Sequence, residues 1–394
     1  MFLKSGQKSP GSWQKLNPGL GFYPSFLMNL FRSFRDPKAV KALVSAIERE
    51  HDGSPLKIME VCGGHTHAIM RFGLNKLLEP LGIEFLHGPG CPVCVMPKER
   101  IDQAVAIARQ PNTILTTYGD MMRVPGSESS LIKERAAGRD VRMVYSPLDA
   151  LKIAEENPDK TVVFFAIGFE TTTPMTAALL EVVRQRGIKN LLVHVNHVLV
   201  IPAMEAVINE SEIEAFIGPG HVSAIIGGNA YKPFVERYGV PVVISGFEPT
   251  DILESVLRIV RQKKEGRAEV EIQYTRAVSW EGNKKAQELM KRYFEVRETF
   301  RWRGLGDIPR SGLKLKEEFA KFDAEVVFDE ILPKRPVDDH KLCICGEILK
   351  GKAKPTDCKI FGTACTPQNP VGACMVSSEG ACAAYYKYLR LAVV

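Results

Sequence analysis

The chain has 394 residues, of which 45% are hydrophobic and 25% charged, and its formal net charge is +6. This length and composition predict a globular protein of two or three domains and exclude an intrinsically disordered chain. No apolar run approaches the roughly 20 residues of a membrane-spanning helix. The basic residues form no stripe with interleaved aromatic residues, so we expect neither membrane insertion nor nucleic-acid binding.

Residues 1–27 lack the cationic start and the uninterrupted apolar block of a secretory signal. We therefore expect a reducing, cytoplasmic compartment, in which the nine cysteines are better interpreted as metal ligands or redox-active thiols than as structural disulfides. We also expect Met28 to be the native start, with residues 1–27 as an extension and residues 28–54 as an N-terminal helical segment.

From residue 36 onward, short β-branched runs alternate with helical periodicity. This order predicts βαβ units with parallel sheets, which we divide into two similar α/β domains at residues 55–150 and 151–264. The predicted strands are Leu56–Val61, Thr113–Thr117, Val141–Tyr145, Thr161–Ile167, Asn190–Val195 and Val240–Ile244. The predicted helices are Pro37–Arg49, Lys98–Arg109, Pro174–Arg186 and Asp251–Lys263.

An internal repeat supports two similar domains. The segment Ile83–Gly90 is echoed by Ile213–Gly220, and the glycines after Cys62 have a counterpart at Gly168. We expect the strand-to-helix loops at the carboxyl edges of the sheets to form the ligand site, as in other open parallel sheets.

The first such loop reads Cys-Gly-Gly-His-Thr-His from Cys62 to His67. Its paired glycines are expected to leave the backbone open to something bulky. A thiolate with nearby imidazoles suits a soft or borderline metal such as ferrous iron. The alternative is a tight turn in which His65 and His67 only cap or pack.

A second loop, Gly88–Cys94, contains Cys91-Pro-Val-Cys94 just before a predicted helix. The amides at a helix N-terminus stabilise a thiolate, so this arrangement favours a redox dithiol or transient metal binding. Half of a distant zinc site and a purely structural role remain alternatives.

Two further motifs are less decisive. The segment Gly168–Pro174 ends a strand and opens a helix, which fits simple capping or an anion site equally well. His194 and His197 lie in an apolar run, where buried histidines with satisfied hydrogen bonds are commoner than ligands.

After Lys264 the chain becomes a charged helical segment and then loops rich in Pro, Gly and Cys, which we predict as a third domain at residues 265–394. Four thiolates can hold an iron–sulfur cluster, and two further thiols can form a disulfide. A zinc site and ordinary buried cysteines are the alternatives. Six of the nine cysteines lie here: Cys343, Cys345, Cys358, Cys365, Cys374 and Cys382.

Taken together, the loops at Cys62–His67, Gly88–Cys94, Gly168–Thr173 and Met375–Cys382 resemble those of the HypD family of NiFe-hydrogenase maturation proteins. The resemblance runs from Met28 to the end. It implies two similar α/β domains plus a cluster domain, and a scaffold on which an iron carrying two cyanides and one carbon monoxide is built. It also implies four partners: HypC, which shares the iron with Cys62; HypE, which delivers cyanide; HypF, which makes it; and the hydrogenase large subunit.

The cysteine-rich tail is similar in layout to ferredoxin-thioredoxin reductase. That similarity implies a 4Fe-4S cluster held by Cys343, Cys358, Cys365 and Cys382. It further implies a disulfide between Cys345 and Cys374.

The resulting hypothesis gives each residue a role. Cys62 anchors the iron, and His65 is its neighbour or proton partner. Electrons pass from the cluster through Cys345 and Cys374 to Cys91 and Cys94, and Glu379 gates or carries protons. These roles favour an assembly scaffold over a turnover enzyme. The rivals are a thiol-disulfide oxidoreductase without an iron-assembly role and a metal-dependent hydrolase built on His65 and His67.

Overall fold

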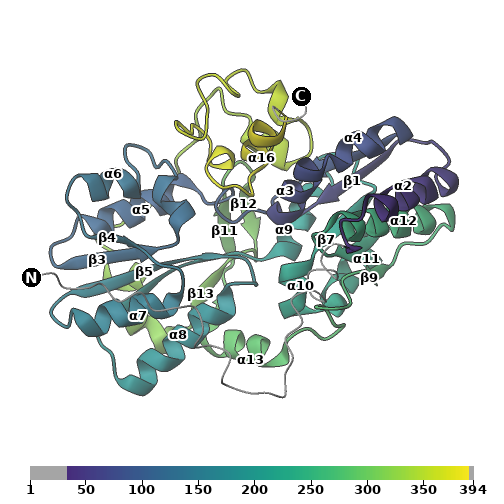
Figure 1. The fold of residues 1–394 in the computed structure, drawn as a ribbon. Helices are drawn as coiled ribbons and strands as arrows, with labels where there is room; N and C mark the ends of the chain where they lie inside the picture. The colour runs from purple at the N-terminus through teal and green to yellow at the C-terminus, as the bar shows by residue number, and fades with distance from the viewer. Residues whose placement is uncertain (1–32, 390–394) are drawn as a thin grey trace, which may run out of the picture.

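The computed structural model describes residues 33–389. It has two lobes, each built on an all-parallel sheet, and a cysteine-rich C-terminal region that lies against both (Figure 1). The predicted extension at residues 1–27 and the start of the segment at residues 28–54 lie outside the described residues. None of the helices in residues 33–389 combines the length and apolar composition that crossing a lipid bilayer would require.

Sheet A has five strands in the order β2-β1-β7-β8-β9. Helices α2, α3, α4 and α12 share one apolar core with it, and α9, α10 and α11 pack on its other face. The strands are β1 (Leu56–Glu60), β2 (Ile83–His87), β7 (Ala215–Pro219), β8 (Val242–Ser245) and β9 (Val270–Ile272). The helices are α2 (Pro37–Glu50), α3 (Gly63–Phe72), α4 (Leu74–Leu78), α9 (Val200–Val207), α10 (Gly220–Ile226), α11 (Lys232–Tyr238) and α12 (Pro249–Lys264).

Sheet B has four strands in the order β4-β3-β5-β6, with α5 and α6 on one face and α7 and α8 on the other. Its strands are β3 (Thr113–Thr117), β4 (Val141–Met143), β5 (Thr161–Gly168) and β6 (Leu191–His197). Its helices are α5 (Lys98–Ala108), α6 (Leu131–Ala136), α7 (Pro147–Glu156) and α8 (Thr173–Arg186). Every strand and helix predicted from the sequence is therefore present, with small shifts of the ends.

Strand pairing divides the chain differently from the predicted boundary at residue 150. Sheet B takes its strands from residues 113–197, while sheet A combines strands from residues 56–87 and 215–272. The two repeated segments, which contain β2 and β7, flank β1 in the same sheet. The order of the strands along the chain does not predict this pairing, because consecutive strands are neighbours only about two-thirds of the time. After β2 the chain leaves sheet A for sheet B and returns at β7.

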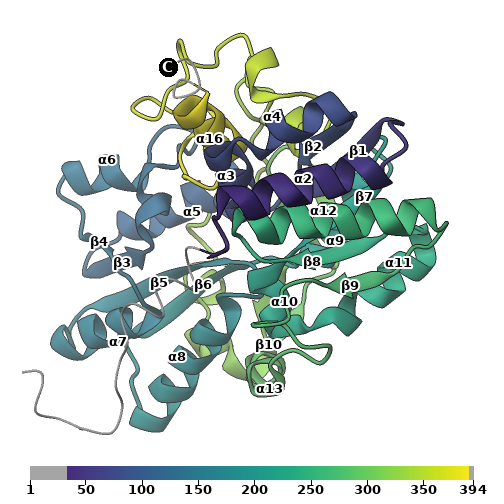
Figure 2. The same cartoon turned by 45° about the vertical axis from the view of Figure 1, so that its right-hand side comes forward.

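The predicted third domain is also divided. β9 belongs to sheet A, and α13 (Lys284–Tyr293) leads into four short strands. β10 (Phe294–Val296) pairs with β13 (Leu313–Leu315), and their side chains join the α7/α8 core of sheet B. β11 (Thr299–Trp302) and β12 (Gly306–Pro309) form a hairpin beneath the C-terminal region (Figure 1). Only residues 340–389, with α15 (Cys345–Leu349) and α16 (Ala381–Tyr388), form the C-terminal cysteine region, which Figure 2 shows above the two lobes.

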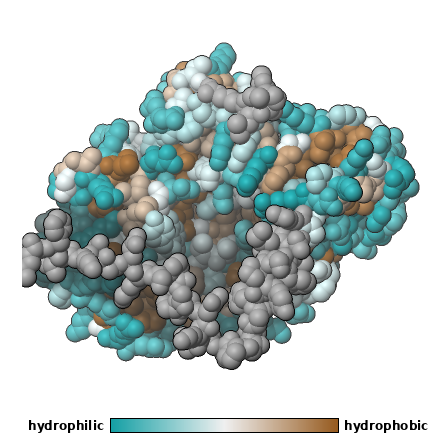
Figure 3. Space-filling view, viewed as in Figure 1, coloured by the Kyte–Doolittle hydropathy of each residue, from teal (hydrophilic) through white to brown (hydrophobic). Residues whose placement is uncertain are grey.

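An apolar groove lies on the outer surface beside α2 and α4. Val40, Val44, Phe72 and Leu77 line it, and Leu77 is 40% exposed. Figure 3 shows the corresponding hydrophobic patch on this side of the molecule. The groove shares no lining residue with the cavity between the two sheets described below.

A buried ion network fastens α5 to sheet B and to α14 (Ala324–Val327). Arg100 donates two hydrogen bonds to Glu325, at 2.7 and 2.9 Å, and others to Asn196 and to the Val195 carbonyl. Arg297 also contacts Glu325. Burial alone would raise the pKa of Glu325, but the two guanidinium charges hold it well below its usual range.

We predict that Glu325→Ala destabilises the fold by about 3–5 kcal/mol, because it leaves two largely buried guanidinium groups without their shared carboxylate. Urea unfolding measures this. Glu330→Ala, an exposed site on the same segment, is the control and should change the free energy of unfolding by less than about 0.5 kcal/mol. Equal effects of the two variants would contradict the role given to the network.

Candidate functional site

A cavity of about 430 Å³ lies where the carboxyl ends of β1, β3, β4, β5 and β7 meet. Sheet A, sheet B and the C-terminal cysteine region each contribute a wall. The lining side chains able to react or form hydrogen bonds are Cys62, Tyr118, Asp120, Tyr145, Thr171, Thr172, His221, Ser377 and Glu379. The cavity thus lies at the carboxyl edges of the sheets, where the sequence predicts the ligand site.

The C-terminal cysteine region is tied to both lobes around this cavity. On the sheet B side, Ser377 donates to Asp120 at 2.8 Å and Arg123 donates to the Val376 carbonyl at 3.0 Å. On the sheet A side, His67 contacts the Ser378 carbonyl at 3.3 Å and the Tyr388 hydroxyl at 3.0 Å. These contacts hold the segment with Ser377 and Glu379 over the cavity.

Cys62 stands at the end of β1 as the N-cap residue of α3. Only 9% of the residue is exposed, and burial raises the pKa of its thiol to about 12, with the neighbouring Glu379 carboxylate acting in the same direction. The isolated thiol is therefore protonated at neutral pH. A cation bound at the sulfur would favour the thiolate instead.

The glycines around Cys62 allow protein segments, rather than a bulky ligand, to approach the backbone. A Cβ atom on Gly63 would collide with Glu379, and one on Gly64 would lie 2.9 Å from the Phe247 ring. A Cβ on Gly90 would overlap the backbone of Cys62 itself. The sequence-based interpretation of the paired glycines was therefore wrong: they bring Glu379 and Phe247 against the loop.

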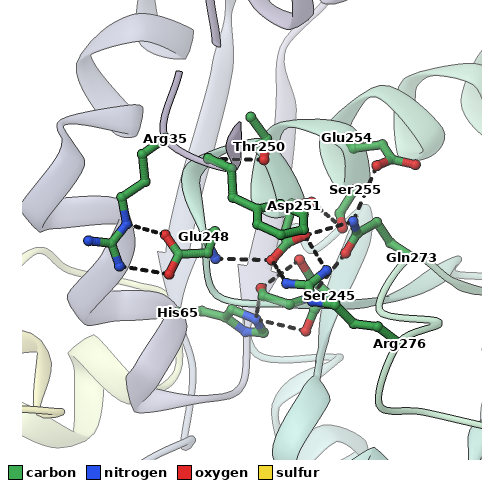
Figure 4. Close-up of polar contacts among 12 residues, drawn as sticks. Arg35, His65, Ser245, Glu248, Thr250, Asp251, Glu254, Ser255, Gln273 and Arg276 are labelled. Carbon is green, nitrogen blue, oxygen red and sulfur yellow. Dashed lines mark hydrogen bonds and ion pairs between the residues drawn. The ribbon is translucent and has the colours of Figure 1, made fainter. Parts of the chain in front are cut away.

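His65 points away from the cavity. Its Nε2 lies 2.9 Å from the Gly246 carbonyl and 3.2 Å from the Ser245 carbonyl, so this nitrogen carries the proton and donates (Figure 4). The ring stacks on Phe247 with centroids 4.6 Å apart, and burial lowers its pKa to about 4. His65 is thus a neutral, fully buried side chain that fixes the α3 loop to the β8 loop. It does not line the cavity beside Cys62.

The loop that receives His65 is itself held by a polar network. Gly246 donates to Gln273 at 3.1 Å, Gln273 donates to Asp251 at 3.0 Å, and Arg276 pairs with Asp251 (Figure 4). Asp251 is 1% exposed and belongs to the first turn of α12. The network extends the anchoring of His65 into the α12 side of the lobe.

Cys91 and Cys94 form a disulfide in the structure. Both are almost fully buried, and the intervening Pro92 and Val93 line the cavity. We expected the N-terminal amides of the following helix to lie next to the two sulfurs. The structure differs, because α5 begins only at Lys98, after Pro97. The spacing therefore identified a sulfur pair, while the proposed stabilisation by the helix was wrong.

Behind Cys62 lies a buried polar network that was not predicted from the sequence. Glu60 is fully buried and accepts hydrogen bonds from the Cys62 N–H at 3.0 Å and from Thr66. It also lies 2.8 Å from His87 Nδ1, and His87 Nε2 is 3.2 Å from the Tyr385 hydroxyl. Burial raises the pKa of Glu60. The available signal was a carboxylate at the end of a mostly apolar strand, directly before the Cys62 loop.

His221 and Asp120 were also missed as lining residues. The repeat could have indicated His221, because it follows Gly-Pro-Gly as Cys91 does. β2, β1 and β7 are adjacent, so the loops bearing Cys91, Cys62 and His221 form a row along one edge of sheet A. The His221 ring stacks on Phe247 with centroids 3.9 Å apart.

The Gly168–Pro174 segment forms a wall of the cavity. Thr172 is the N-cap of α8 but makes no side-chain cap; its hydroxyl donates to the Ile167 carbonyl at 3.2 Å. The Glu170 carboxylate instead accepts the Val200 N–H, at 3.2 and 3.3 Å, at the start of α9. Glu170 is fully buried with no cation beside it among the contacts of the described residues, and burial raises its pKa to about 7.

The two histidines in the apolar run of β6 are buried as predicted. His194 contacts Gln103 at 3.0 Å and Asn196 at 2.8 Å, and His197 contacts Thr176 at 2.9 Å. Neither lines the cavity.

The six C-terminal cysteines are gathered within one small region. Cys343 and Cys345 have their sulfurs 3.3 Å apart, and a Cβ on Gly372 would lie 2.6 and 2.7 Å from them. A hydrogen bond with Cys345 raises the pKa of Cys382. Cys358 is half-buried, with its sulfur 3.7 Å from the Leu342 carbonyl. Cys345 and Cys374 are free thiols here, so their pairing stays a prediction.

These thiols fit an iron–sulfur cluster in kind, since at least four soft sulfur donors are present and Gly372 leaves room for two of the sulfurs. Their arrangement does not by itself specify a metal. Within residues 33–389, no group of three or more His, Cys, Asp or Glu side chains is arranged so that it could hold an ion.

Comparison with known proteins gives consistent relatives. The profile of the family described as "HypD: Hydrogenase formation hypA family" matches residues 38–389. The hydrogenase maturation factor HypD2 of Bradyrhizobium diazoefficiens is 53% identical over 367 residues, covering 91% of this chain and 96% of the relative. HypD of Azotobacter vinelandii is 53% identical, with 92% and 97% covered, and HypD of Escherichia coli is 47% identical, with 92% and 98% covered.

We predict that Glu170 makes the protein less stable as pH rises from about 4.5 to about 7. The unfolded carboxyl loses its proton near 4.5, whereas the folded one retains it up to about 7. The stability present below pH 4.5 is therefore lost across this window, by roughly 3 kcal/mol for the full shift. Urea unfolding at several pH values should show a flatter profile for Glu170→Gln, but not for the exposed control Glu318→Gln. A profile of Glu170→Gln identical to wild type would contradict the assignment.

Proposed function

This chain belongs to the HypD family of hydrogenase maturation factors, and on that premise we propose that it is the scaffold on which the Fe(CN)2CO group is assembled. The supporting observation is the placement of the Cys62 thiol in a cavity that three separate parts of the chain enclose. A scaffold must hold an intermediate away from solvent while leaving one side accessible. A cavity at the junction of two lobes suits that task.

In this proposal Cys62 binds the cargo iron through its sulfur. Thiolate is a soft ligand that suits iron bearing cyanide and carbon monoxide. The thiol is protonated without metal, so iron binding releases its proton. Asp120, His221 and Glu379 line the same cavity and supply hydrogen-bonding groups around the cargo.

The structure favours positioning roles for the two histidines of the Cys62 loop. His65 is committed to the backbone of Ser245 and Gly246, and His67 to the C-terminal region. We therefore place His65 as a residue that orients the Cys62 loop, and we no longer propose it as a proton partner. The same observation weighs against a hydrolase with a metal bound by His65 and His67.

The remaining cysteines are proposed to manage reducing equivalents. Opening the Cys91–Cys94 disulfide takes up two electrons and two protons, and the loop between these residues lines the cavity. Cys343, Cys358, Cys365 and Cys382 would hold a 4Fe-4S cluster, which supplies electrons one at a time when bound. Cys345 and Cys374 are the thiols left to exchange with other sulfur groups.

The proposed partners follow from the family. HypC shares the iron with Cys62, HypE delivers cyanide that HypF prepares, and the finished group passes to the large subunit of a NiFe hydrogenase in the cytoplasm. A thiol-disulfide oxidoreductase without iron assembly is the second candidate, because the structure contains one disulfide among nine cysteines. Bound iron with cyanide and carbonyl ligands separates the two.

We predict that Cys62→Ala abolishes the cyanide and carbonyl infrared bands of the complex purified anaerobically with HypC, because the iron loses its sulfur anchor. Its brown absorbance should stay within about 10% of wild type, since Cys62 belongs to another part of the fold from the C-terminal thiols. Bands of wild-type intensity would exclude the anchor role.

We predict the reverse pattern for Cys358→Ala: loss of brown colour and of most of the bound iron when the protein is isolated without HypC. The two variants thus serve as controls for each other. An unchanged iron content in Cys358→Ala would remove this residue from the ligand set.

A further inference from the structure

The tip of the β11–β12 hairpin touches the two segments that carry the thiols assigned to redox chemistry in the proposed function. The hairpin lies between the two lobes, directly beneath the C-terminal cysteine region (Figure 1). Trp302, the last residue of β11, is 1% exposed and donates to Ser311 at 2.8 Å, which fixes the strand below the tip. The tip itself consists of Arg303, Gly304 and Leu305.

The first contact is with the Cys91–Cys94 loop. The backbone N–H of Arg303 donates to the carbonyl of Val95 at 2.7 Å, and Val95 directly follows Cys94. Both residues are buried, so this hydrogen bond is shielded from water. The carboxyl end of the disulfide loop is thereby attached to the hairpin.

The second contact is with the C-terminal thiols. Gly304 has a φ of +77°, and a Cβ there would lie 2.6 Å from the Cα of Gly346. Gly346 directly follows Cys345 in α15, and a Cβ on Gly346 would lie 2.6 Å from the Gly304 carbonyl oxygen. The two backbones touch because both residues lack a side chain.

The Arg303 side chain makes a third contact. Its Nε donates to Asp339 at 2.7 Å, four residues before Cys343, and its Nη1 lies 3.5 Å from the Pro125 carbonyl. The side chain is 3% exposed, and its Nη2 is buried without a hydrogen-bond partner among the described residues. Burying a guanidinium N–H without a partner is unfavourable, so the hydrogen bonds to Asp339 and Val95 must offset this cost.

We propose that Arg303 and Gly304 are positioning residues that couple the Cys91–Cys94 pair to Cys345. When the disulfide opens, the two sulfurs move from bonding distance to van der Waals distance. Because the surrounding interior is close-packed, this displacement is transmitted to Val95. The hairpin tip carries it to Gly346 and changes the accessibility of the Cys345 thiol. This inference rests on the proposed assignment of both groups to thiol chemistry.

The test measures how fast iodoacetamide alkylates Cys345 in the full chain, purified anaerobically, with the Cys91–Cys94 pair either closed or open. Oxidised dithiothreitol closes the pair by taking two electrons and two protons from it. Reduced dithiothreitol, removed before alkylation, opens the pair. Peptide mass mapping reports the state of the pair and the modification of Cys345, and rates are compared only for molecules in which Cys345 itself is a free thiol in both states. In the wild type, the two states should differ in rate by about fivefold or more.

The hairpin provides a matched control for the key variant. Gly304 and Gly306 both have positive φ, of +77° and +79°, so alanine strains the backbone equally at each. Only at Gly304 does the added Cβ meet another residue; at Gly306 nothing lies within 4 Å. Gly306→Ala should retain the rate difference, whereas Gly304→Ala should lose it. Arg303→Met, which removes the contact with Asp339 but keeps the backbone N–H, should lose it as well.

Equal alkylation rates in the two states of the wild type would overturn the proposal. So would a rate difference that survives in either folded variant, or one that is lost in Gly306→Ala. If Gly304→Ala does not fold, as judged by near-UV circular dichroism, Arg303→Met decides. The measurement needs neither iron nor a partner, so its outcome is independent of the infrared test of Cys62.

Discussion

Close approach of backbones around Cys62 is the constraint on which the arrangement of the site depends. Gly90 lies against the Cys62 main chain, and Gly63 lies against Glu379. Any side chain at either position would push apart segments that belong to β1, the disulfide loop and the C-terminal region. Because these contacts involve backbone atoms, rotation of a neighbouring side chain cannot relieve the overlap. The cavity exists in its present form because three segments meet at two residues without Cβ atoms.

The same convergence places acidic groups in a setting of low polarity. Burial is the main cause that raises the pKa values of Glu60 and Glu379, and the nearby Asp120 charge raises that of Glu379 as well. The Cys62 loop contacts both residues, and the charges of both carboxyl groups also raise the pKa of the Cys62 thiol. A bound cation favours the charged forms of such acids, and it therefore stabilises a group whose ionisation is otherwise unfavourable. This electrostatic argument supports the proposal that iron binds at this thiol.

Several buried residues around the cavity hold its walls in place instead of lining it. His65 holds the loop to Ser245 and Gly246, Glu60 holds the Cys62 amide, and Glu170 ties the opposite wall to α9. At a greater distance, Arg303 and Gly304 connect the disulfide loop to Cys345 and Gly346. Such supporting contacts fix the geometry of a site whose chemistry takes place on a few atoms.

The sequence by itself determined the alternation of strands and helices, the loops that carry Cys62 and Cys91–Cys94, the gathering of cysteines near the C-terminus, and the family. Each of these is encoded locally, in periodicity or in a short motif. Tertiary structure alone decided that β1 pairs with both β2 and β7, that His65 turns away from the cavity, and that Gly63 makes room for Glu379. It also brought His221 and the β11–β12 hairpin to the cysteines. A local pattern shows that a strand is buried or that a glycine is required, but it does not show which distant segment lies alongside, because packing of the whole chain determines that neighbour.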